Sequence, residues 1–125
     1  MSITTAGKGL SSGLLGAVGT PVAVKWLAYG TGTTAFNVAQ TILVAESQRA
    51  AATVTQVTTT VANDTVQLTK TFSITGTEAI SEIGAFNDAA VGTLFARATS
   101  TDAHFTLKNV TSGDSFALTY KCKCA

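Results

Sequence analysis

The sequence predicts an all-β fold: a single antiparallel β-sandwich or jelly-roll-like barrel of about seven or eight strands, with an extended N-terminal arm. Residues 65–75 and 115–124 alternate apolar and polar side chains with the two-residue period of a half-buried strand. Other short runs rich in Thr and Val are separated by residues typical of turns. No helical run is long enough to connect parallel strands, which argues against a parallel α/β fold.

The first twenty residues are expected to form the arm, and residues 21–125 the β-domain. The segment 1–20 is rich in Gly, Ser and Thr and has no regular period. It is either a flexible tail or an arm that becomes ordered on a neighbouring subunit, because terminal segments stay disordered unless something ties them down. Its large apolar side chains favour docking on a partner; they are Ile3, Leu10, Leu14 and Leu15.

Strands are expected along the rest of the chain. The turn residues Gly30-Thr31-Gly32 end the first of them, and Asn63-Asp64 suits a tight turn between two others. Residues 38–46 fit either a short helix or an irregular crossover. The expected strands cover residues 22–29, 49–61, 65–75, 78–86, 93–99, 103–110 and 115–124.

The composition argues against several classes of partner. Charged residues are 12% of the chain and the net charge is +1, so a basic surface that binds nucleic acid is not expected. The longest uncharged stretch, residues 9–24, is too short and too rich in glycine to cross a membrane, and it is a poor signal peptide. An uncharged surface promotes association, which predicts a homo-oligomer made in the host cytoplasm.

The sequence offers little material for catalysis, so no catalytic, cofactor-binding or metal-binding residue is predicted, and the chain is not expected to be an enzyme. His104 is the one histidine, and no serine lies in a nucleophile turn. The turn aspartates are expected to cap local backbone. Glu78 and Glu82 are expected on one strand face, as solvated or partnered carboxylates or as a joint cation site. Cys122 and Cys124 are expected to be reduced thiols, because an i, i+2 pair is poorly placed for a disulfide.

Four residues are candidates for an interface. Trp26 and Tyr29 lie in an expected strand and serve either as core packing or as interface anchors. Arg49 and Arg97 are the only guanidinium groups. Each is expected to pair with a carboxylate, within the chain or across a subunit boundary.

Two segments resemble the small β-rich structural proteins of tailed bacteriophages. The first is Gly30-Thr-Gly-Thr-Thr34 followed by residues 41–49, TILVAESQR. The second is residues 79–87, AISEIGAFN, followed by residues 92–97, GTLFAR. The resemblance covers residues 30–120, with departures at Phe36, at Ala85 and in the terminal KCKCA. It implies a non-enzymatic β-sandwich within a phage particle.

Three functions follow as alternatives. The first is a capsid decoration or cement protein, whose arm and uncharged β-surfaces bind the major capsid protein and which forms a small symmetric oligomer such as a trimer. The second is a tail, baseplate or fibre component that binds other tail proteins and takes part in host attachment. The third is a carbohydrate-binding module that uses Trp26, Tyr29 and Tyr120.

Overall fold

A computed structural model describes residues 2–124; Met1 and Ala125, which the expected arm and β-domain include, lie outside the described residues. The described chain is mostly strand, with a single helix α1 (Thr5–Gly16), so the all-β class is confirmed. The strands are β1 (Ser2–Ile3), β2 (Trp26–Gly30), β3 (Glu46–Ala51), β4 (Thr53–Val57), β5 (Thr65–Ser73), β6 (Glu78–Ile80), β7 (Glu82–Phe86), β8 (Leu94–Thr99), β9 (Lys108–Val110) and β10 (Ser115–Lys123).

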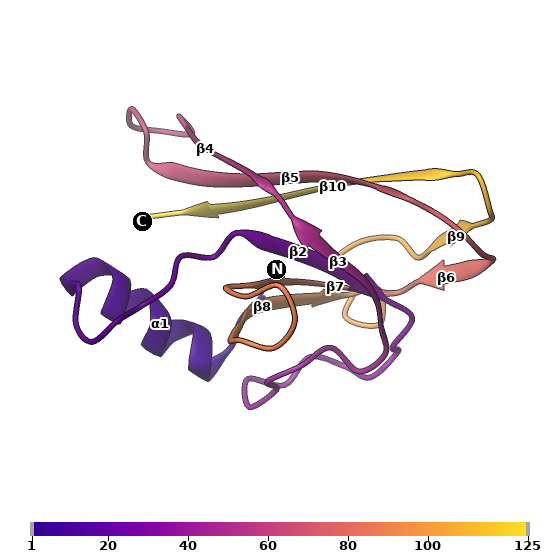
Figure 1. Cartoon of the computed structure of the whole chain (residues 1–125), viewed down its shortest axis with the longest axis horizontal. Coiled ribbons are helices and arrows are strands. Elements are labelled where there is room, and N and C mark those ends of the chain that lie inside the picture. The colour runs from indigo at the N-terminus through magenta and orange to yellow at the C-terminus, as the bar shows by residue number, and fades with distance from the viewer. Residues whose placement is uncertain (1, 125) are drawn as a thin grey trace.

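The strands form antiparallel sheets that lie in two layers (Figure 1). A five-stranded sheet has the order β1-β8-β7-β2-β3, and a three-stranded sheet has the order β10-β5-β4. A small two-stranded sheet, β6-β9, lies at the end opposite α1. Within residues 2–124 no sheet closes into a barrel.

The larger hydrophobic core brings together side chains from both layers. Leu27 and Ile83 of the five-stranded sheet are buried in the same cluster as Leu68, Phe72 and Leu118 of the three-stranded sheet. Strand alternation explains this, because the apolar faces of β5 and β10 point toward the other layer. The alternating patterns of residues 65–75 and 115–124 are therefore confirmed, and the two strands pair along their whole length from Ser115↔Ser73 to Lys123↔Thr65.

Two of the expected strands are each divided between sheets. The run 49–61 breaks at Ala52, whose N–H donates to Lys25 O, so that β3 joins the five-stranded sheet and β4 the three-stranded sheet. The run 78–86 breaks at Ser81, which separates β6 from β7. A single run of strand-forming residues thus serves both layers.

The expectation of an extended N-terminal arm is wrong for residues 5–16, which form α1. The Thr4 hydroxyl caps this helix by accepting the Gly7 N–H at 2.9 Å, and Ala17 ends it in the left-handed conformation. Gly7 lies directly on β8, where a Cβ would come within 2.1 Å of Phe95 O. The helix is therefore held by its contacts with the sheet, since its glycines give it poor intrinsic propensity.

Residues 31–45, here called the β2–β3 loop, form the irregular crossover that was one of the two alternatives for residues 38–46, with no helix. Leu43 is buried on the outer face of the five-stranded sheet, where it packs in a second small cluster with Ala28, Phe86 and Leu94. This face is therefore covered by the loop, and the middle strands of the sheet are buried on both sides.

Candidate functional site

A fully buried ion pair joins β7 to β8. Arg97 Nε donates to Glu82 Oε1 at 3.0 Å, and Nη2 lies 2.9 Å from the same oxygen. Neither side chain has any exposed surface. Because the removal of each charge from water costs several kcal/mol, such a pair persists only where further polar contacts surround it.

Those contacts come from the β2–β3 loop. The Glu82 carboxylate accepts the N–H groups of Gly32 at 3.0 Å, Val44 at 2.9 Å and Ala45 at 2.6 Å. Arg97 Nη1 donates to Gln40 Oε1 at 3.2 Å. Hydrogen bonds to an ionised carboxylate are about twice as strong as neutral ones. The ion pair therefore fixes both ends and the middle of the loop on the sheet.

Two glycines allow the loop to lie this close. A Cβ at Gly32 would stand 2.4 Å from Glu82 Oε2, and a Cβ at Gly30 would stand 2.2 Å from Ala45 O. Neither glycine has a positive φ, so the requirement is space rather than backbone conformation. The Gly-Thr-Gly motif is thus explained by close packing of the loop on the buried carboxylate.

The residues that carried the phage resemblance meet at this point. Gly30 and Gly32 come from its first segment, and Glu82 and Arg97 from its second. The sequence prediction missed that Glu82 and Arg97 are partners. A signal was present, because each is the lone charge within an otherwise uncharged strand.

The pairing of Glu78 with Glu82 is wrong, since the two carboxylates point into different surroundings. Glu78 accepts the Tyr29 hydroxyl at 3.3 Å and the Ser47 hydroxyl, whereas Glu82 is enclosed with Arg97. Among residues 2–124 there is no group of three or more His, Cys, Asp or Glu side chains placed to hold a metal ion. Cys122 and Cys124 are both unbonded thiols.

Tyr29 and Arg97 are interior residues, so their expected role at an interface is wrong: neither has exposed surface in the folded chain. The Tyr29 ring packs edge-on against Phe72 at 5.0 Å and Phe116 at 5.5 Å between ring centroids. Burial and the nearby Glu78 carboxylate raise the pKa of Tyr29. Tyr120 is buried as well, which removes two of the three aromatic residues proposed for sugar binding.

Trp26 and Arg49 lie nearer the surface. Trp26 is half-buried against the small core cluster. The Arg49 guanidinium lies 3.4 Å above the Phe86 ring, pairs with Glu46 at 2.6 Å and donates to Val91 O at 2.8 Å. The expected carboxylate partner of Arg49 is therefore found, within its own chain.

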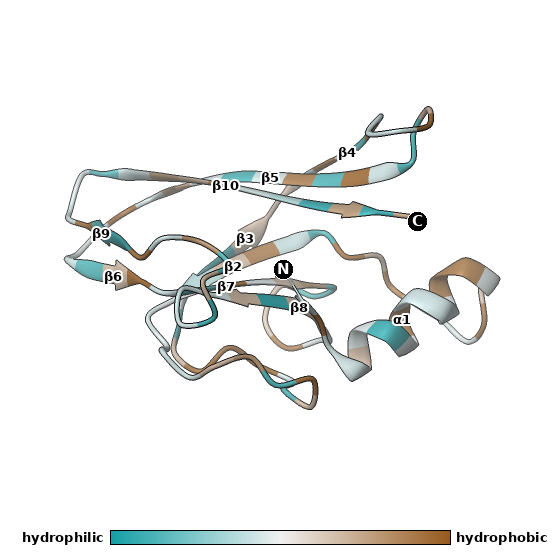
Figure 2. Ribbon diagram, turned by 180° about the vertical axis from the view of Figure 1, so that it is seen from behind, coloured by the Kyte–Doolittle hydropathy of each residue, from teal (hydrophilic) through white to brown (hydrophobic). Residues whose placement is uncertain are grey.

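The four apolar residues predicted in the arm divide into two pairs. Ile3 and Leu10 are half-buried and pack against the larger core. Leu14 and Leu15 are 38% and 92% exposed, and Val18 and Val22 in the following segment are 73% and 53% exposed. These last four residues are called the apolar end below, and Figure 2 shows the hydrophobic turn at the end of α1.

Most turn carboxylates cap backbone, as predicted. Asp64 accepts the N–H groups of Val61, Thr59 and Thr60, which lower the pKa of its carboxyl. The Thr99 hydroxyl and the Phe36 N–H lower the pKa of Asp102 in the same way. His104 Nδ1 accepts the Thr99 N–H at 3.2 Å. These side chains are thus occupied in holding loops.

The comparisons give no relative from which a function can be transferred. No protein family, curated protein or solved structure matches the chain. None of the helices within residues 2–124 has the length and apolar character required to span a membrane.

Proposed function

We propose that the chain is a non-enzymatic structural protein of a tailed-phage particle, a β-sandwich that decorates and stabilises the head shell. The apolar end carries this proposal, because large apolar side chains project into solvent from an ordered helix terminus. Contiguous apolar surface of this kind marks contact sites for other proteins. The proposed partner is the major capsid protein.

The position of the apolar end suits such a contact. In Figure 1, α1 and the turn after it project from one end of the layered body, away from the β6-β9 sheet. Lys8 is the one charged residue in the helix, and none lies between Gly16 and Val24. Burying one such Leu or Val side chain contributes about 1.5–3 kcal/mol, so several together offset the loss of freedom on association.

The β2–β3 loop supplies a second uncharged surface. Val38, Ile42 and Val44 are about half to two-thirds exposed, at 49%, 68% and 48%. The buried ion pair holds this loop in place before any partner binds. A preordered surface loses less conformational entropy on binding, which favours a role in assembly.

A second candidate is a tail, baseplate or fibre component that contacts other tail proteins. The same apolar end would serve there, and the uncharged surface equally favours a homo-oligomer. The two proposals differ in stoichiometry, because a head shell contains many more subunits than a tail structure.

Quantitative mass spectrometry of purified virions tests the proposal. Copies of this chain are counted against the major capsid protein and against a tail protein of known copy number. Hundreds of copies per particle support the decoration role, and a handful supports the tail role. Absence of the chain from intact particles contradicts both.

A further inference from the structure

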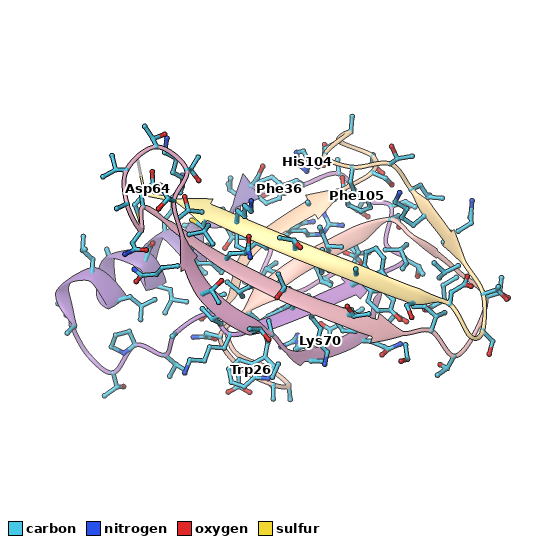
Figure 3. The ribbon with its side chains drawn as sticks, turned by 90° about the horizontal axis from the view of Figure 1, so that it is seen from above. Trp26, Phe36, Asp64, Lys70, His104 and Phe105 are labelled. Carbon is cyan, nitrogen blue, oxygen red and sulfur yellow. The ribbon has the colours of Figure 1, made fainter. Side chains whose placement is uncertain are left out.

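The outer edge of β10 has no strand beside it. β10 is the terminal strand of the three-stranded sheet, and its nine residues pair with β5 alone. Among residues 2–124, no backbone hydrogen bond other than those to β5 is made by residues 115–123. In Figure 3, β10 borders the upper layer on the side where His104 and Phe105 are labelled. A long open edge is a template for another strand.

The hydrogen bonds at the two ends of β10 establish which of its groups face outward. Ile74 N donates to Asp114 O, and Cys124 N donates to Asp64 O. Both bonds follow the β5–β10 register, so the even-numbered residues of β10 bond to β5. In an antiparallel pair the bonding direction alternates residue by residue. The N–H and C=O groups of the odd-numbered residues, with Thr119 at the centre, therefore point out of the sheet, and all five of these residues are exposed.

We propose that this edge pairs with β10 of a second copy of the chain, antiparallel, about a two-fold axis at Thr119. This register joins the nine residues of one strand to the nine of the other. It places odd-numbered residues opposite odd-numbered ones, so that outward N–H groups meet outward C=O groups. The two three-stranded sheets become one continuous sheet, and the contact closes on itself because the same surface is used by both copies.

The charges along the strand select this register. Lys121 and Lys123 lie in the second half of β10, while Ser115, Ala117 and Thr119 in the first half are uncharged. With the axis at Thr119, Lys121 of one copy lies opposite Ala117 of the other. Lys123 lies opposite Ser115, next to the turn that holds Asp114 of the other copy. An axis at Lys121 would oppose two like charges, which is destabilising, and an axis at Ala117 would leave both lysines unpaired.

The inner side of the edge also gains contacts. Phe116 and Cys122 are the half-buried residues on the inward face of β10, and this register places each opposite the other. A cavity of about 370 Å³ opens beside the strand between Phe116 and Phe105. The pairing brings the two cavities together across the axis and removes apolar surface from water. This contact is independent of the virion role, because it requires only copies of this chain.

Charge variants at Ala117 test the register. Ala117→Glu places a carboxylate opposite Lys121 of the second copy, and Ala117→Lys places a like charge there. Sedimentation equilibrium is expected to show a wild-type dimer, with the dissociation constant changed roughly two- to thirtyfold downward by Ala117→Glu and upward by Ala117→Lys. The double variant Ala117→Lys with Lys121→Glu is expected to restore the dimer. Equal dissociation constants for the Glu and Lys variants overturn the proposal.

A backbone variant tests the edge itself. Thr119→Pro removes an outward N–H that the folded chain does not use, and proline is tolerated at such an edge position. It is expected to leave the circular dichroism spectrum unchanged and to abolish the dimer, whereas the control Thr119→Val keeps the N–H and the dimer. A wild-type chain that stays monomeric at high concentration, or a dimer that survives Thr119→Pro with unchanged affinity, overturns the proposal. Neither result bears on the copy number in virions, so the two proposals fail separately.

Discussion

Arg97 Nε lies 3.0 Å from Glu82 Oε1 on the neighbouring strand, and both side chains are completely shielded from solvent. The same carboxylate accepts three backbone N–H groups of the β2–β3 loop. One buried group therefore links two strands of the sheet to a long irregular segment. The loop has no regular backbone ladder of its own, so its position depends on this link.

Replacing one member of the ion pair is expected to destabilise the fold severely. Glu82→Gln leaves the Arg97 guanidinium buried without its counter-charge, which typically costs about 3–5 kcal/mol. Urea denaturation measures this as a lower transition midpoint.

The matched control is Glu46→Gln, which breaks the partly exposed pair with Arg49. Exposed pairs contribute about 0–1 kcal/mol, so the control is expected to remain close to wild type. An equal loss of stability in both variants would contradict the special role of the buried pair.

Parts of this fold could be predicted from local pattern alone. The alternation in β5 and β10 specifies strand and face together, because side chains on a strand alternate strictly. The aspartates at turns, Asp64 among them, were likewise predicted to cap backbone, since a short carboxylate reaches the adjacent N–H groups.

Other parts depended on contacts that are distant in sequence. Helix α1 has weak intrinsic propensity and forms where Gly7 meets Phe95. The break at Ala52 follows from its bond to Lys25, and the enclosure of Glu82 from a loop far away in the chain. Sequence periodicity cannot show which of two carboxylates, Glu78 or Glu82, will be covered, because both fit the same strand pattern.

A methyl group at Gly32 is expected to destabilise the chain by displacing the β2–β3 loop. The added Cβ would lie 2.4 Å from Glu82 Oε2 and 2.6 Å from Val44 Cβ, so the carboxylate or the loop must move. We expect Gly32→Ala to cost about 1–3 kcal/mol, as overpacking in a well-packed site typically does. Thermal and urea denaturation measure the change.

Gly9→Ala is the matched control for that substitution. No atom lies within 4 Å of a Cβ at Gly9, and the residue is inside α1. Alanine is favoured over glycine in a helix by about 1 kcal/mol, so this variant is expected to stabilise the chain. A Gly32→Ala variant as stable as Gly9→Ala would show that the loop has room near Glu82.

Protonation of Asp64 is expected to weaken the β4–β5 connection at acid pH. Three backbone N–H groups hold the pKa of this carboxyl below its ordinary value of 3.8 in the folded chain. A lowered folded-state pKa means that the folded state favours the ionised form. The resulting stability is fully present above pH 4 or so and is lost as pH falls toward the folded pKa.

Asp64→Asn tests this dependence, because it removes the charge at every pH. The difference in unfolding free energy between wild type and variant, measured by urea denaturation, is expected to be largest near pH 7 and to shrink below about pH 4. A difference that stays constant down to pH 2 would show that the carboxylate charge is not what holds the turn.

The apolar end is expected to bind the particle without contributing to the fold. Leu15 is 92% exposed, so Leu15→Asp removes no core packing and is expected to leave the unfolding midpoint within about 0.5 kcal/mol of wild type. If Leu15 becomes buried against the head shell, its loss weakens binding roughly 10- to 150-fold. Co-sedimentation with particles that lack this chain measures the binding. Val91→Asp is the control, because Val91 is 79% exposed and lies outside the apolar end; it is expected to bind as wild type, and equal losses in both variants would place the contact elsewhere.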